Sequence, residues 1–308
     1  MRPTTVHSAY AYLLSSAVPP APATVAFVQD VGAIEAVRLI SADRAPLAVL
    51  AEQRPGDHHD AARRALAVAA LHKHRLITPQ DAEWPDNQLA RTSAFCPPLA
   101  LWVHGDGQLK DHAERSVAIV GARHPTTYGK IYSMDIAAGL ARHGITIWSG
   151  GTAGVPSQAH RGAYNARGAS VAVLGSGMRN RYPANHESLV LGCSPGTLVV
   201  SEYNPLTMPP IPNANAHNRL LAALTRVCVV VEPGLSSGVM AVVAHAENNG
   251  SPILAFPGPV NTLTFEQSHD LIRTGRATLI SGAEHVFECV PGLTRDIDRT
   301  PDEETPGP

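Results

Sequence analysis

From Arg115 onward, short apolar runs alternate with longer segments that have helical periodicity. Runs such as Val171–Leu174 are apolar at consecutive positions, which is typical of strands covered on both faces. The alternation predicts an α/β fold in which helices cover both faces of a parallel sheet. The predicted strands are 116–120, 145–148, 170–174, 197–200, 227–231, 252–255 and 277–280. The predicted helices are 130–143, 157–167, 185–191, 217–225, 238–249, 268–273 and 282–289.

The part of the chain before this alternation has a different pattern. Residues 1–50 show helical spacing around 10–17 and 34–40, interrupted by prolines, and predict a small helical module. Residues 51–114 are expected to connect it to the sheet, through a helix at 57–74 and an extended run at 99–103. Residues 115–290 form the predicted sheet domain, and the Pro- and acid-rich residues 291–308 a disordered tail.

Composition narrows the class of protein. The 308 residues carry a net charge of −2, so the chain is not polybasic. Nucleic acid stays possible, because its binding needs a local basic patch and not a basic total. An aromatic content of 5% weakens any stacking platform. The four cysteines include no CxxC pair and no segment reaches the length of a membrane span, which predicts a cytoplasmic protein.

Glycine-rich corners after the predicted strands are candidate ligand contacts, because ligands of open parallel sheets lie beyond the carboxyl ends of the strands. Gly121-Ala-Arg123 places a guanidinium after a tight turn, where it could clamp phosphate. Ser149-Gly150 through Gly154 resembles an anion nest, and His217-Asn218-Arg219 precedes a helix whose first amides could bind an anion. The alternatives are an Arg123 paired with a carboxylate, a plain turn, and helix capping by Asn218.

Other chemistries are weaker. Gly234-Leu-Ser-Ser-Gly238 fits the G-x-S-x-G pattern of serine hydrolases, with Asp270 and His285 following in triad order and His104–Gly107 as an oxyanion loop. Such a short pattern arises easily among 25 glycines. The histidine pairs at 58–59 and 72–74 lack the i, i+4 spacing that places two ligands on one metal. We therefore expect no metal and no cofactor.

A series of short motifs, in order and at plausible spacing, resembles the DNA-processing protein A (DprA/Smf) family over residues 75 to about 288. The motifs are Val120-Gly-Ala-Arg123 with Tyr128-Gly129, Ser149-Gly150 with Gly154, Ala159-His160-Arg-Gly-Ala163, Val173-Leu-Gly175, Tyr182-Pro183, Val200-Ser-Glu202, Asn218-Arg-Leu-Leu-Ala-Ala-Leu224, Val231-Glu232, Ser237-Gly238, Phe256-Pro-Gly258 and Leu271-Ile272 with Gly275.

The resemblance implies an extended Rossmann-like fold and a non-catalytic homodimer that binds single-stranded DNA. It also implies a RecA-type recombinase as partner, loaded onto DNA during natural transformation or recombination. In this interpretation Arg123 and Arg219 hold phosphate. Gly121, Ser149, Gly150 and Gly154 supply backbone and hydroxyl contacts, and His217, Asn218, Ser237 and Gly238 lie at the edge of the crevice.

The chain departs from the family pattern around the crevice. His217 replaces an arginine, so a permanent charge becomes one that ordinarily titrates near pH 6.5. Pro156, Ser236, Val239 and Val242 replace other polar or charged groups. Two further hypotheses stay open: a nucleotide-binding or nucleotide-sensing protein, and a partner that dimerises and recruits a recombinase without gripping DNA.

Overall fold

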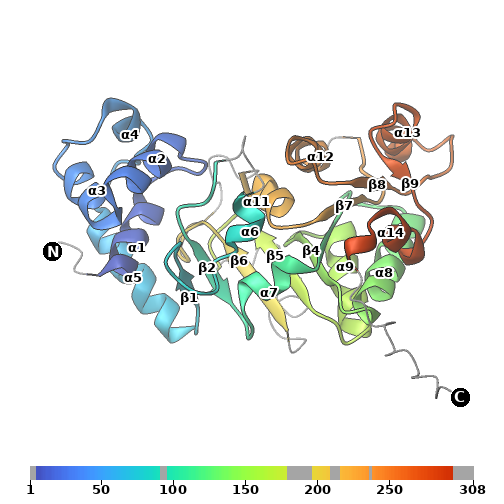
Figure 1. Ribbon diagram of the computed structural model, residues 1–308, viewed down its shortest axis with the longest axis horizontal. Coiled ribbons are helices and arrows are strands. Elements are labelled where there is room, and N and C mark those ends of the chain that lie inside the picture. Colours follow the sequence, from blue (N-terminus) through green and yellow to red (C-terminus); the bar gives the residue numbers. More distant parts are fainter. Residues whose placement is uncertain (1–4, 91–95, 179–195, 209–215, 236–237, 294–308) are drawn as a thin grey trace, which may run out of the picture.

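The computed structural model describes residues 5–90, 96–178, 196–208, 216–235 and 238–293. Its centre is a nine-stranded sheet in the order β1-β2-β6-β5-β4-β3-β7-β8-β9 (Figure 1). The strands are β1 (Arg75–Ile77), β2 (Leu101–His104), β3 (Ser116–Val120), β4 (Thr146–Gly150), β5 (Ser170–Leu174), β6 (Thr197–Ser201), β7 (Val227–Val230), β8 (Ile253–Ala255) and β9 (Thr278–Leu279).

The seven strands from β3 onward are parallel, as the sequence predicts, while β1 and β2 join the β6 edge in antiparallel pairing. Six of the seven predicted helices in this part lie in described residues, and each matches an observed helix to within a few positions. The helix predicted at 185–191 lies outside the described residues. The six matching helices are α8 (Thr127–Arg142), α9 (Val155–Asn165), α11 (His217–Ala223), α12 (Val239–Asn248), α13 (Glu266–Arg273) and α14 (Ala283–Cys289).

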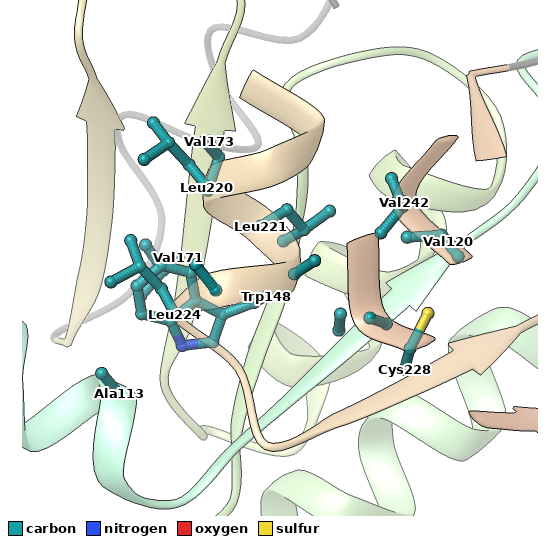
Figure 2. Close-up of a cluster of buried hydrophobic side chains, with 14 of the residues drawn as sticks. Ala113, Val120, Trp148, Val171, Val173, Leu220, Leu221, Leu224, Cys228 and Val242 are labelled. Atoms are coloured by element: carbon teal, nitrogen blue, oxygen red, sulfur yellow. The ribbon is translucent and has the colours of Figure 1, made fainter. Parts of the chain in front are cut away.

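Successive side chains of a strand point to opposite faces of the sheet, and each face of this sheet is covered by its own set of helices. One face packs against α11, α12, α13, α6 (Asp86–Ala90) and α7 (Leu109–Glu114). The other face packs against α8, α9 and α14. Figure 2 shows Leu224, just after α11, beside Trp148 and Val171, with Leu220 near Val173 and Leu221 on the side of the helix toward Val242. Full burial of each leucine contributes about 1.5–3 kcal/mol, which holds α11 against the sheet.

Five helices precede the sheet: α1 (Val6–Ser16), α2 (Pro22–Val31), α3 (Ala33–Ile40), α4 (Leu47–Ala51) and α5 (His58–Leu71). Pro22 is one of the prolines expected to interrupt the helical pattern of residues 1–50. It is instead the first residue of α2, where its missing N–H costs no hydrogen bond. This layer shares one apolar cluster with Trp102 on β2 and Val199 on β6. It therefore covers the β1–β6 end of the sheet, on the left of Figure 1.

The remaining described elements are two 3₁₀ turns, η2 (Leu263–Phe265) and η3 (Pro291–Leu293). The tail predicted over 291–308 lies outside the described residues from 294 onward. None of the described helices is both long and apolar enough to span a membrane. Cys228, on β7, is buried in the core as its apolar neighbours predict.

Candidate functional site

A pocket of about 60 Å³ lies where the carboxyl ends of β3 and β4 meet the starts of α11 and α12. Its polar lining among the described residues comprises Gly121, Arg123, Ser149, Gly150, Thr152, His217, Asn218 and Gly238. Its apolar lining comprises Val120, Pro156, Leu221, Val239 and Val242. Seven of the ten predicted site residues thus surround one hollow, although they come from four separate segments.

The loop from Gly121 to Thr126 carries Arg123 to the pocket. Gly121 is required there, because a Cβ would lie 2.0 Å from the carbonyl oxygen of Val231 at the end of β7. Arg123 is exposed, and it forms no ion pair with another described residue. Within the described part of the chain, the alternative of an Arg123 paired with a carboxylate therefore finds no support.

The end of β4 uses its polar groups to hold itself in place. The Ser149 hydroxyl donates to the Ile119 carbonyl at 2.6 Å, and His160 Nε2 lies 3.2 Å from the Gly150 carbonyl. Both Ser149 and His160 are buried. Ser149 therefore holds the end of β4 against β3, and the ends of these two strands form part of the pocket wall. Thr152, the second hydroxyl residue of the 149–154 segment, is half-buried and also lines the pocket.

Gly154 lies beside the pocket and not among its lining residues. Its φ is +87°, and a Cβ would lie 2.2 Å from the Ala122 carbonyl oxygen. Its neighbour Val155 donates its N–H to that same carbonyl at 2.9 Å. Gly154 therefore packs α9 closely against the Arg123 loop, and its contact with a ligand stays a prediction.

Helix α11 brings His217 and Asn218 to the pocket. His217 Nε2 lies 3.9 Å from the position of a Cβ on Gly150, across the opening. The Asn218 side chain donates to the Gly238 carbonyl at 3.2 Å, and so links α11 to the start of α12. The N-cap of α11 is Ala216, with no side-chain hydrogen bond. Capping by Asn218, the alternative for this residue, is therefore replaced by a tertiary contact.

Arg219 requires a correction. Its side chain is only 5% exposed and binds both carboxylate oxygens of Glu202 at 2.5 Å. It also donates to the main-chain oxygens of Cys96 and Ala216. Burial disfavours the guanidinium charge, but Glu202 outweighs that effect and raises the pKa of Arg219 above its ordinary value. Arg219 therefore ties α11 to Glu202, after the end of β6. Its side chain points from the helix into the core and cannot also reach the pocket, so it does not share a phosphate with Arg123.

The starts of α8 and α9 offer fewer amides than expected. Glu232 is fully buried, and its carboxylate accepts from the Thr126 N–H at 3.0 Å and from the Thr126 hydroxyl at 2.7 Å. Thr126 in turn caps α8 by accepting from the Gly129 N–H. In α9, the Val155 N–H bonds to the Ala122 carbonyl and Pro156 has none. Protein groups thus satisfy much of what the glycine corners were expected to present to a ligand.

The rim around the pocket nevertheless favours anions. The described residues that line the pocket include no Asp or Glu. Two carboxylates follow strands of the sheet, Glu202 after β6 and Glu232 after β7. Both are buried, the first paired with Arg219 and the second bound to the start of α8. Among the described lining residues, Arg123 carries an exposed guanidinium. A phosphate that enters the pocket therefore meets the Arg123 guanidinium and no carboxylate among the described lining residues.

Other predicted chemistry does not assemble. Ser236 and Ser237 lie outside the described residues. Asp270 binds Arg273 at 2.5 Å, while His285 Nδ1 accepts from the Ser281 N–H at 3.1 Å, so the two candidate triad members have separate partners. Throughout the described ranges, no group of three or more His, Cys, Asp or Glu side chains is placed to hold a metal ion.

The fold and pocket define a Rossmann-like α/β protein with a ligand crevice at the carboxyl ends of its strands. Residues 75–291 match the sequence model of the DNA recombination-mediator protein A family, and the chain belongs to this family. It is 36% identical to the putative DNA processing protein DprA of Mycobacterium tuberculosis, over 92% of this chain and 74% of that protein. It is 35% identical to protein Smf of Escherichia coli, over 70% of this chain and 56% of that protein.

Two solved structures are similar. DprA of Streptococcus pneumoniae superimposes with a TM-score of 0.72 at 23% identity, over 94% of this chain and 98% of that one. DprA of Helicobacter pylori, whose structure concerns its binding of single-stranded DNA, gives a TM-score of 0.62 at 25% identity, over 72% of this chain and 98% of that one. The first likeness supports the extended Rossmann-like fold predicted from the motifs.

Proposed function

We propose that this chain binds single-stranded DNA along the rim of the pocket, with Arg123 as a principal phosphate contact. The observation that carries the proposal is the exposed Arg123 at a pocket whose described lining includes no carboxylate. A guanidinium can grip phosphate through two parallel hydrogen bonds, and phosphate contacts dominate the affinity of proteins that bind DNA without reading its sequence.

The dimensions of the pocket favour a backbone group over a base. A volume of about 60 Å³ accommodates a few water-sized groups. Glycine at 121 and 150 lets main-chain atoms approach such a group closely. His217 faces the pocket opposite Gly150 and would add a second, weaker positive contact. The DNA-binding relative of H. pylori lends this interpretation its family context.

The proposal is tested by fluorescence anisotropy with labelled oligo-dT over a range of salt concentrations. The Arg123→Ala variant should bind on the order of tenfold more weakly or worse, and its log–log salt slope should fall by about 0.7, the value for one single-strand phosphate contact. Arg142→Ala is the matched control, since this exposed arginine ends α8, the helix that follows the Arg123 loop, about 24 Å from the start of that helix. An Arg123→Ala variant that binds unchanged contradicts the proposal, as does wild-type affinity weaker than about 100 µM at low salt.

The wider role belongs to the same proposal. We infer a non-catalytic cytoplasmic homodimer that assists loading of a RecA-type recombinase. Two features at this end of the sheet support self-association: β9 is the last strand in the sheet order, and the side chains of Val260 and Leu263, in the segment that follows β8, are exposed. Light scattering tests the dimer. Pull-down with a RecA-type recombinase, with and without oligonucleotide, separates DNA-dependent loading from recruitment alone.

A further inference from the structure

Glu232 holds both ends of the loop that carries Arg123. Its main-chain carbonyl accepts from the Ala122 N–H at 2.8 Å. Its carboxylate accepts from the Thr126 N–H at 3.0 Å and from the Thr126 hydroxyl at 2.7 Å. The two anchored residues directly bracket Arg123, His124 and Pro125. A single residue just after the carboxyl end of β7 thus fixes the position of the loop that follows the neighbouring strand β3.

The surroundings of Glu232 are adapted to this contact. Its φ of +48° is the left-handed conformation that non-glycine residues avoid. Such strain persists where neighbouring structure enforces it, and often where a site depends on it. Gly129 leaves room for the carboxylate, since a Cβ there would lie 2.1 Å from Glu232 Oε2. The carboxylate is completely buried and lies outside the pocket lining, so it does not itself face a ligand.

We propose that Glu232 is a positioning residue, which fixes the Ala122–Thr126 loop and thereby sets Arg123 at the mouth of the pocket. The part that concerns DNA rests on the proposed function. The part that concerns the loop does not. An arginine on a loop without this anchor samples many positions, and each phosphate contact then costs the entropy of ordering both the loop and the side chain.

The N-terminal helices contain a matched control. Glu52 caps α2 with the same chemistry, accepting from the Ala23 N–H at 2.9 Å, the Thr24 N–H at 2.8 Å and the Thr24 hydroxyl at 2.7 Å. It belongs to the layer over the other end of the sheet. Glu52→Gln therefore removes one carboxylate oxygen from a helix cap, as Glu232→Gln does, without touching the Arg123 loop.

The first arm of the experiment measures hydrogen exchange in the intact chain without DNA. Glu232→Gln replaces one acceptor by an NH₂ group that faces donors, so exchange in residues 122–130 should rise by about tenfold or more. Glu52→Gln should leave this segment unchanged. If hydrogen exchange in residues 122–130 of Glu232→Gln equals that of the wild type, the proposal is overturned, whether or not the protein binds DNA.

The second arm measures oligo-dT binding and its salt slope in a double-mutant cycle. If Glu232 acts through Arg123, Glu232→Gln lowers the slope by about 0.7. The double variant with Arg123→Ala then binds no worse than Arg123→Ala alone. Fully additive losses, or an equal loss in Glu52→Gln, show a merely structural role and reject the positioning of Arg123. Wild-type protein that does not bind oligo-dT rejects the proposed function, while the exchange arm still decides on the anchor.

Discussion

Replacing Gly154 by alanine tests whether this glycine packs the site or contacts a ligand. The structure places Gly154 where α9 meets the Arg123 loop, at a φ of +87° and a ψ of −135°. An added Cβ would lie 2.2 Å from the Ala122 carbonyl oxygen and 2.5 Å from main-chain atoms of Arg123. Because these neighbours are backbone atoms, no side-chain rotation relieves the overlap.

The expected loss of stability has two parts. Holding a non-glycine residue in this conformation costs about 1–3 kcal/mol. Moving the surrounding backbone to admit the methyl group costs roughly another 1–3 kcal/mol. The Gly154→Ala variant should therefore lose about 2–6 kcal/mol, and its Tm should fall by about 2–4 °C for each kcal/mol.

Gly250→Ala is the control for left-handed strain alone. Gly250 follows α12 with a φ of +67°, and a Cβ there would meet nothing within 4 Å. Its loss should be about 1–2 kcal/mol. Urea and thermal unfolding compare the two variants. A Gly154→Ala protein no less stable than Gly250→Ala would refute the packing argument. If Gly154→Ala weakens oligo-dT binding and Gly250→Ala does not, we attribute the weaker binding to displacement of the Arg123 loop.

Two further predictions concern buried charge. Arg219→Ala leaves Glu202 buried without its ion-pair partner and should destabilise the fold by about 3–5 kcal/mol, whereas Arg276→Ala, which breaks the partly exposed pair with Glu247, should cost about 1 kcal/mol or less in the same urea titration. Burial, and then two neighbouring histidine rings, lower the pKa of His74 to about 4. The folded state therefore binds fewer protons than the unfolded one, and stability is lost as pH falls from about 6.5 toward 4. The loss should be about 1–2 kcal/mol after allowance for partial solvent exposure, and His74→Gln should reduce it. A variant with the same pH profile as wild type contradicts this assignment.

The candidate site was only partly predictable from the sequence. Glycine after an apolar run indicates a sharp strand-to-helix corner, and this pattern located Gly121 and Gly150. The sequence did not distinguish Arg123 from Arg219, because both arginines were expected close to the start of a helix at the carboxyl ends of the strands. Their difference arises from a partner distant in sequence, since Glu202 follows β6 and lies 17 residues before Arg219. Glu232 was noticed within a motif, but its contacts with Thr126 span 106 residues.

The sequence by itself determined the type and approximate bounds of the described strands and α-helices from β3 to α14. A strand buried on both faces must be apolar at consecutive positions, and a helix on a sheet must be apolar at every third or fourth. Tertiary structure alone decided that β1 and β2 join antiparallel at the β6 edge, and which charged groups face solvent. Strand order and charge pairing are decided by contacts between residues far apart in the chain, and local periodicity carries no record of those partners.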